Sequence, residues 1–341
     1  MNFWTEQRLN RLIFSLAIIL IFLFIANFIK VDYFITAPGM TLSLDQIITA
    51  EIGSKNARGA LYLTSVTSKQ ANLFSFILFS ILRPKGYELT PKKDVLLENM
   101  SMEEYVEIMQ DMMLESQMFA KVVALREMGY ETDISGKGAR IVEILEISKA
   151  NGILQEGDII VGINGKPIQL ASEAVSQIRK QNIGDIVNIE VDRDGQKLEL
   201  EVEIIESFNE PGIGIYILTH ERDFSFPVKI EIAAENIIGP SAGTMFTLEI
   251  INQLIEEDIT RGYQIAGTGT IDLDGNIGPI SGVAQKVLTA EKEGVDYFLA
   301  PVENYVEAKK AASKIKVVEI DTIKNTLKFL KSLPEKTNLK P

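Results

Sequence analysis

The chain has 341 residues, of which 46% are hydrophobic, so it is long enough to form two or three domains with apolar cores. Its formal net charge is −13 and it shows no clusters of Lys and Arg, which argues against a nucleic-acid-binding surface. Cys is absent and His220 is the only His, which excludes zinc clusters, thiol nucleophiles, disulfide frameworks and haem attachment. We therefore expect no metal site and no cofactor.

An uncharged stretch of 18 residues, LIFSLAIILIFLFIANFI, runs from Leu12 to Ile29. As a helix it would span roughly 27 Å, about the thickness of a hydrocarbon core. Arg8 and Arg11 precede it, which predicts a cytoplasmic N-terminus and an outward-facing remainder. The stretch is longer than the apolar region of a signal peptide and no clear cleavage site follows it. We therefore expect a retained single-pass anchor, and assign residues 1–32 to a cytoplasmic tip and a transmembrane helix.

The next hundred or so residues mix strand and helix patterns. The text GALYLTSVT indicates a strand, and NLFSFILFSIL, from Asn72 to Leu82, is an apolar run of 11 residues. This run is too short to cross a bilayer, so it predicts a buried helix or, alternatively, a surface that dips into a membrane. A capping box of Ser101 and Glu104 predicts a helix from Ser101 to Met128.

Between residues 129 and 206 the pattern changes to short strands and turns. Alternating residues on both sides of Asp194-Gly195 predict a β-hairpin. The text GDIIVGING, from Gly157 to Gly165, resembles the motif of bacterial PDZ domains. A small β-sandwich without a ligand is the alternative. The resemblance implies a loop and strand edge that receive a peptide by adding it to the sheet, formed by Gly138, Ala139, Arg140 and Ile141.

After a NEPG break at Asn209 to Gly212, the pattern indicates a compact α+β unit. In ENIIGPSAGTMFTLEII, Ser241 follows Pro240 and stands just before a helix whose apolar residues recur at spacings of three and four. Unpaired amides and the positive end of the helix dipole at this place can bind a developing anion. Ser241 is therefore either a helix cap or a nucleophile.

A hydroxyl nucleophile needs a base. His220 lies in the charged stretch LTHERDF and is expected at the surface, which leaves a Lys in place of a Ser-His-Asp triad. A Lys accepts a proton only when neutral, so burial must lower its pKa from about 10.4 towards about 7 or 8. Lys229 should face solvent and Lys292 lies in a charged patch. Lys286 adjoins an apolar helix stripe and is the best candidate for a half-buried amine, with ordinary snorkelling as the alternative.

The text GPSAG with Ser241, followed by GTGTIDLDGNIGPISGVAQKVLTAEKEGV and an FLAP strand, resembles the proteolytic domain of the Lon family. The resemblance covers about residues 208 to 333. It implies that Ser241 and Lys286 form a Ser-Lys dyad and that Thr268 positions the Lys amine. One departure is Ile238, at a place where Lon proteases often carry an Asp. The supporting residues that the resemblance implies are Gly239, Pro240 and Ala242.

No P-loop of the G-x-x-x-x-G-K-[ST] kind is present in the sequence, so no ATPase segment is expected. The combination of anchor, PDZ domain and Lon-like domain resembles the membrane-bound YlbL and SepM group of Gram-positive bacteria. We therefore predict an α+β protein of five parts. These are the transmembrane segment (1–32), the N-terminal part of the protease-associated region (33–128), the PDZ domain (129–206), the Lon-like proteolytic domain (207–334) and a tail (335–341).

The predicted function is that of an ATP-independent, membrane-anchored serine endopeptidase. It would cleave extracytoplasmic peptides or small loosely folded proteins, with the PDZ domain recognising substrates or gating the site. The predicted partners are peptide or protein substrates and the cell membrane, with no nucleic acid, and homo-oligomerisation stays open. One alternative is a membrane PDZ scaffold with an inert Lon-like domain. Another is a small-molecule kinase, because Gly-Ser-Ala turns before helices also hold phosphate.

Overall fold

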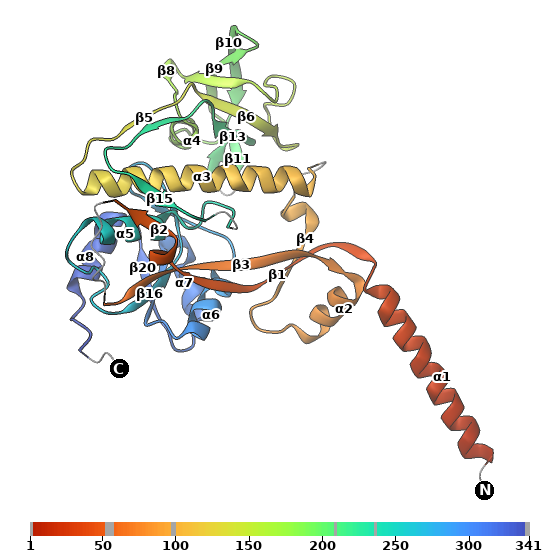
Figure 1. Cartoon of the computed structure of the whole chain (residues 1–341). Helices are drawn as coiled ribbons and strands as arrows, with labels where there is room; N and C mark the ends of the chain where they lie inside the picture. The colour runs from red at the N-terminus through yellow and green to blue at the C-terminus, as the bar shows by residue number, and fades with distance from the viewer. Residues whose placement is uncertain (1–2, 52–57, 97–99, 208–209, 235–236, 338–341) are drawn as a thin grey trace.

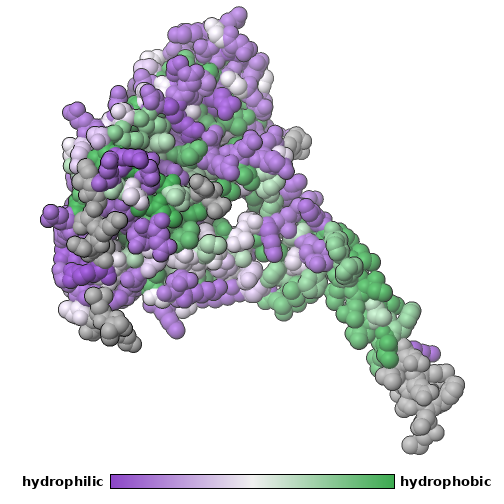
Figure 2. All heavy atoms as spheres, in the orientation of Figure 1, coloured by the Kyte–Doolittle hydropathy of each residue, from purple (hydrophilic) through white to green (hydrophobic). Residues whose placement is uncertain are grey.

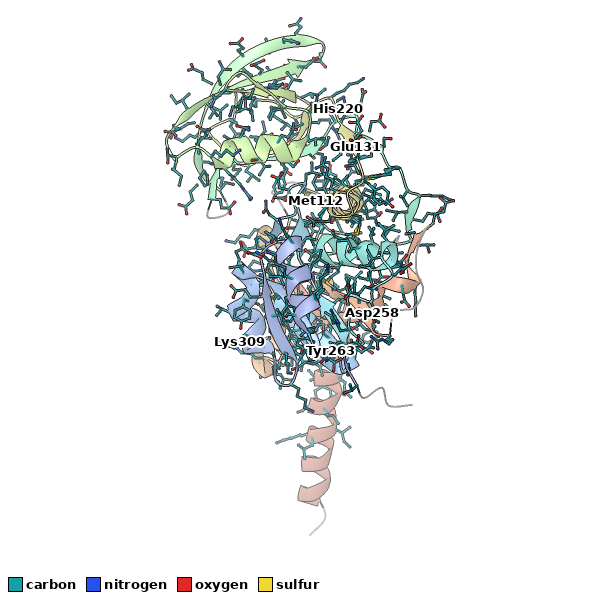
Figure 3. The ribbon with its side chains drawn as sticks, turned by 90° about the vertical axis from the view of Figure 1, so that its left-hand side faces the viewer. Met112, Glu131, His220, Asp258, Tyr263 and Lys309 are labelled. Atoms are coloured by element: carbon teal, nitrogen blue, oxygen red, sulfur yellow. The ribbon has the colours of Figure 1, made fainter. Side chains whose placement is uncertain are left out.

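The computed structural model describes residues 3–51, 58–96, 100–207, 210–234 and 237–337 (Figure 1). One long helix, α3 (Met102–Glu127), lies between two sheets, and Figure 3 shows it end-on between the same two parts. The predicted capping box is confirmed: Ser101 Oγ accepts a hydrogen bond from the Glu104 N–H at 3.1 Å, and the Glu104 carboxylate accepts one from the Ser101 N–H at 2.7 Å. The chain therefore begins this helix where its local sequence predicts.

The first sheet has six strands in the order β20-β19-β16-β3-β1-β4. In this sheet β16 runs parallel to β3 and β19, whereas β1 is antiparallel to β3 and β4. Early and late parts of the chain thus build one sheet together. The strands are β1 (Lys30–Ser43), β3 (Ala60–Asn72), β4 (Glu88–Pro91), β16 (Gln264–Gly267), β19 (Tyr297–Pro301) and β20 (Lys316–Ile320).

Helices cover both faces of the first sheet, because its side chains alternate between two cores. On β16, Ile265 points into a core that contains Phe246. The next residue, Ala266, points into a second core that contains Val287. The helices that follow the strands are α5 (Gly243–Leu254), which carries Phe246, α6 (Val283–Glu293), which carries Val287, α7 (Val302–Ala311) and α8 (Ile323–Ser332).

The second sheet has the strand order β10-β9-β7-β6-β13, with β8 paired to β7. Its predicted hairpin is confirmed, since Asp194 and Gly195 join β9 to β10 with φ values of 52° and 82°, the left-handed conformation that a two-residue turn of this kind needs. The elements are β6 (Ala139–Ile144), β7 (Ile159–Ile163), β8 (Lys166–Pro167), α4 (Ala171–Arg179), β9 (Ile186–Arg193), β10 (Gln196–Glu203) and β13 (Ile215–Thr219).

Short two-stranded pairs complete the described fold. The chain enters the second sheet through β5 and leaves it through β14, and these two strands pair antiparallel. The short strands are β5 (Asp133–Ser135) with β14 (Asp223–Ser225), β2 (Ile48–Ala50) with β15 (Ile230–Ile232), β11 (Ile205–Ser207) with β12 (Glu210–Gly212), and β17 (Thr270–Ile271) with β18 (Ile277–Gly278). Two 3₁₀ turns lie at η1 (Leu44–Gln46) and η2 (Lys92–Asp94).

The predicted transmembrane helix is wrong. Helix α1 (Phe3–Ala26) ends at Ala26, so the uncharged run that begins at Leu12 is helical only up to that residue. At about 1.5 Å per residue this part is roughly 22 Å long, which is shorter than a hydrocarbon core of about 30 Å. Among the residues that the structure describes, none of the helices has the length and apolar character needed to cross a membrane.

The apolar run before Arg83 forms the predicted helix, α2 (Leu73–Leu82), but this helix is not buried. No residue of α2 is buried, and the side chains of Ile81 and Leu82 are 74% and 65% exposed. Figure 2 shows apolar side chains gathered over α2 and the neighbouring part of α1. The expectation of a buried helix is therefore wrong, because in the described part of the chain no further layer covers the side of α2 that faces away from the first sheet (Figure 1).

The shared sheet predicts that early strands stabilise late ones. Leu63, on β3, is 1% exposed and lies in the core with Phe246. Leu63→Ala should lower the local free energy of unfolding by about 2–5 kcal/mol through the lost contacts and the cavity. Hydrogen exchange of the β16 amides measures this change. Lys69→Ala, at an exposed position of the same strand, is the control and should change it by less than about 0.5 kcal/mol. Equal exchange in the two variants would contradict the shared sheet.

Candidate active site

Ser241 lies in the loop that leads into α5. The helix begins at Gly243 and its N-cap is Ala242, and no side chain caps it. Ser241 is therefore not the helix cap. Its Oγ instead lies 2.7 Å from the Nζ of Lys286. The loop turns at Gly239, whose φ of 87° is in the left-handed region that favours glycine.

The segment after β16 holds the Ser241 backbone in place. The Ser241 carbonyl accepts two hydrogen bonds, from the Thr268 hydroxyl and from the Gly269 N–H, each at 2.9 Å. The Gly269 carbonyl in turn accepts from the Thr244 N–H at 3.1 Å. A Cβ at position 269 would lie 2.6 Å from the Thr244 Oγ1, so only glycine permits this approach. The end of β16 thus fixes the start of α5.

Lys286 is buried, with only 3% of its surface exposed, so its side chain does not snorkel to solvent. It closes the first turn of α6, next to the buried residues Val283 and Val287. Its Nζ donates to the Thr268 Oγ1 at 3.0 Å and lies within hydrogen-bond distance of the Ser241 Oγ. Burial disfavours the charged ammonium and lowers the pKa of Lys286 to about 8. A substantial fraction of this amine is therefore neutral near physiological pH.

Free backbone amides lie beside the Ser241 hydroxyl. Within the described part of the chain, the N–H groups of Ser241 and Ala242 have no hydrogen-bond acceptor. Both precede the first turn of α5, where the partial positive charge of the helix dipole is concentrated. The arrangement combines a hydroxyl, a partly neutral amine and a place for a developing negative charge, which is what acyl transfer requires.

Two families of domains match the chain. A model of the PDZ domain matches residues 123–204, and a model of the Lon protease (S16) C-terminal proteolytic domain matches residues 227–333. The site described above lies within the second match. The chain is thus similar to a PDZ domain over one region and to the Lon proteolytic domain over another.

Curated relatives share part of their length with this chain. It is 28% identical over 141 residues to the Lon protease of Campylobacter concisus, which covers 40% of this chain and 17% of that protein. It is 32% identical over 111 residues to the Lon protease of Rickettsia felis, and this match covers 32% of this chain and 14% of that protein. The chain thus spans less than a fifth of these relatives. Among solved structures, the PDZ domain of an SdrC-like protein from Listeria innocua is 28% identical and covers 25% of this chain and 97% of that structure, with a TM-score of 0.23.

The PDZ domain differs from expectation at Gly138, Ala139, Arg140 and Ile141. These residues begin at the loop before β6, and β6 lies between β7 and β13. Ala139, for example, pairs with Ile160 on one side and Thr219 on the other. They therefore do not form a free strand edge, and the outer strand on this side of the sheet is β13. This strand follows the NEPG break, so the sequence pattern alone placed it outside the PDZ domain.

The other positions named from the sequence are not in contact with the Ser241 hydroxyl. His220 follows β13, and its Nε2 is 3.5 Å from a carboxylate oxygen of Glu221. Figure 3 labels His220 on the opposite side of α3 from the first sheet. Lys229 is exposed and forms an ion pair with Glu231, as expected of a solvent-facing residue. Ile238, three residues before Ser241, is 40% exposed, and as an Ile it offers no carboxylate to the loop.

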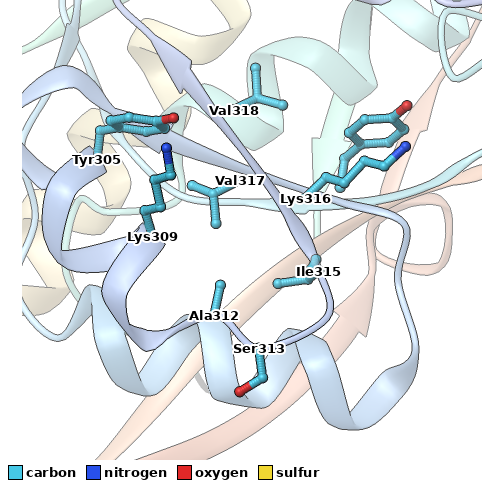
Figure 4. A pocket seen from close by; sticks show the side chains of 9 residues that line it. Tyr305, Lys309, Ala312, Ser313, Ile315, Lys316, Val317 and Val318 are labelled. Carbon is cyan, nitrogen blue, oxygen red and sulfur yellow. The ribbon is translucent and has the colours of Figure 1, made fainter.

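A surface pocket of about 490 Å³ lies between α7 and β20, away from the Ser241 loop (Figure 4). In Figure 4 the Lys309 amine approaches the Tyr305 ring, which agrees with a distance of 5.5 Å between Nζ and the ring centroid. The pocket shares no residue with the site, and we assign it no part in the chemistry. Its lining consists of Tyr297, Tyr305, Lys309, Ala312, Ser313, Ile315, Lys316, Val317 and Val318.

The lowered pKa of Lys286 makes a prediction about stability. Between pH 8 and pH 10.5 the unfolded chain holds a proton at Lys286 that the folded chain has lost, so the free energy of unfolding rises with pH. Relative to Lys286→Met, the wild-type protein should gain about 3 kcal/mol between pH 7 and pH 10.5. Urea unfolding of both proteins measures the difference, in which other titrating groups cancel.

Lys292→Met is the matched control, because Lys292 lies on the same helix at an exposed position. The wild-type and Lys292→Met curves should stay parallel over this pH range. A constant difference between the wild type and Lys286→Met would mean that the pKa of Lys286 is not lowered by burial.

Proposed function

We propose that this protein is an ATP-independent serine endopeptidase in which Ser241 and Lys286 form the catalytic dyad. The observation that carries the proposal is the 2.7 Å distance between the Ser241 Oγ and the Nζ of a buried Lys whose pKa is lowered to about 8. The match to the Lon-type proteolytic domain over residues 227–333 supports the same reaction class.

The mechanism uses groups already in place. Neutral Lys286 takes the hydroxyl proton of Ser241 as the Oγ attacks a peptide carbonyl, which forms a tetrahedral intermediate. The amides of Ser241 and Ala242 stabilise its oxyanion. The Lys286 ammonium then returns the proton to the leaving amine, and an acyl-enzyme remains. Lys286 next removes a proton from water as the water attacks the ester, and returns this proton to the Ser241 Oγ as the acid leaves. The Thr268 hydroxyl keeps the amine in place.

We propose extended peptides or loosely folded proteins as substrates. No ATPase segment is expected from the sequence, and in this proposal the substrate itself presents an accessible peptide bond. The PDZ domain offers β-strand addition as a way to recognise such chains, and β13 is the outer strand of its sheet. The location outside the cytoplasm was inferred from the transmembrane helix, which is wrong. It stays an untested prediction.

The first test removes the nucleophile. Ser241→Ala should lower kcat for cleavage of an unfolded protein by at least about 10³-fold, because no acyl-enzyme can form. A fluorescence assay with a labelled unfolded protein measures the rate. Ser225→Ala, at an exposed position, is the control and should cleave like the wild type. Equal cleavage by Ser241→Ala and wild type would rule out the dyad and leave a non-catalytic PDZ scaffold as the better account.

The second test uses pH. Since a general base acts in its deprotonated form, kcat should rise with pH through the pKa of Lys286 near 8, and reach a plateau about one unit above it. Lys229→Met, which removes an exposed amine, should keep the same profile. Measuring kcat from pH 5 to pH 10 with a short peptide gives this profile. Full activity at pH 5 would exclude a Lys base.

A further inference from the structure

Helix α3 contacts both the PDZ domain and the loop that carries Ser241. Figures 1 and 3 show the helix between the two domains from two directions. Two consecutive residues, Glu115 and Ser116, point to different neighbours, because successive side chains on a helix lie about 100° apart. Glu115 reaches the PDZ domain and Ser116 reaches the loop.

On the side of the proteolytic domain, α3 holds the loop by two hydrogen bonds. The Ser116 hydroxyl donates to the Pro240 carbonyl at 3.0 Å. The Gly239 N–H donates to the Met109 carbonyl at 2.8 Å. Pro240 and Gly239 are the two residues that precede Ser241. The contact is close, since a Cβ at Gly243 would lie 2.7 Å from the Ser116 Oγ. The backbone just before the nucleophile is thus positioned by α3.

On the other side, α3 holds the end of β13 in the PDZ domain. The Thr219 hydroxyl donates to a carboxylate oxygen of Glu115 at 2.6 Å, and the same hydroxyl accepts from the N–H of Ala171, the first residue of α4, at 3.0 Å. One turn earlier on the helix, Asp111 accepts hydrogen bonds from Arg222 at its carbonyl and its carboxylate, at 3.3 and 3.2 Å. Thr219 is 5% exposed, so this junction between β13, α4 and α3 excludes most water.

We propose that α3 couples the PDZ domain to the active site, with Ser116 as a positioning residue for Ser241 and Glu115 as the contact that transmits the state of the PDZ domain. The inference rests on the proposed function, because it assumes that Ser241 is the nucleophile. A helix is rigid over one turn, so a rotation or shift of α3 that moves Glu115 also moves Ser116 and the Pro240 carbonyl. A change at either end therefore affects the other by the same coupling free energy.

The test compares variants at the two ends of the link in the full chain. Ser116→Ala and Glu115→Ala should each lower kcat for a short peptide by about 5-fold or more, with a much smaller change in KM. Both variants weaken the support of the loop that carries Ser241 and leave the substrate-binding groups in place. Glu115→Gln should retain activity, since its amide oxygen still accepts from Thr219. Glu107→Ala, at an exposed position of the same helix, should match the wild type. A wild-type kcat in Glu115→Ala would overturn the coupling.

Hydrogen–deuterium exchange of residues 239–246 gives a readout that needs no catalysis. Exchange there should be about 5-fold faster in Glu115→Ala than in Glu107→Ala, and Thr219→Val, altered on the PDZ side, should reproduce the change. Unchanged exchange in both variants would overturn the coupling. The proposed function is tested separately: it fails if Ser241→Ala cleaves the substrate as fast as the wild type does. The two failures are therefore distinguishable.

Discussion

The buried amine of Lys286 is the constraint on which the rest of the structure depends. A polar group that is 3% exposed needs hydrogen-bond partners, and the Nζ finds two, the hydroxyls of Ser241 and Thr268. Neither partner is a carboxylate, so nothing on them restores the proton affinity that burial removes. The same burial that makes the amine a usable base therefore also requires that the two hydroxyls be held in place.

The first sheet meets this requirement by bringing three distant segments to one edge. The helices α5 and α6 cover opposite faces of the sheet, as their separate cores show. Side chains from opposite faces can meet only beyond the end of a strand, and Thr268 is the residue that directly follows β16. The carboxyl ends of parallel strands are where open α/β sheets usually bind their ligands. β3, from the first part of the chain, is a direct neighbour of β16 and so belongs to the support of the site.

The sequence correctly predicted features that depend only on neighbouring residues. The turn at Asp194-Gly195 and the cap at Ser101 depend on residues within one or two turns, and both form as expected. The apolar stripe beside Lys286 indicated a half-buried amine or, alternatively, a snorkelling side chain, and in the structure the amine is buried and lies 2.7 Å from the Ser241 Oγ. Of the two interpretations of Ser241, the helix cap does not form, since the helix begins two residues later and two hydrogen bonds from the segment after β16 hold the Ser241 carbonyl.

The failures at α2 and β6 share a different cause, because each depends on parts of the chain far away in the sequence. The exposure of α2 follows from the absence of a covering layer in the described fold, which no pattern within the ten residues of this helix reveals. The position of β6 inside its sheet depends on β13, which returns to pair with it more than 70 residues later along the chain. Register and strand order are set by such long-range pairs.

The position of α3 also explains why residues 207–334 do not complete the site by themselves. The carbonyl of Pro240 and the amide of Gly239 bond to Ser116 and Met109, which lie before the PDZ domain in sequence. The chain then passes through β5, builds the PDZ domain and returns through β14, which pairs with β5. The PDZ domain is therefore inserted between the helix that positions the loop and the loop itself. Any motion of that insertion relative to α3 acts on the backbone next to Ser241, because the two contacts of α3 are made by adjacent residues.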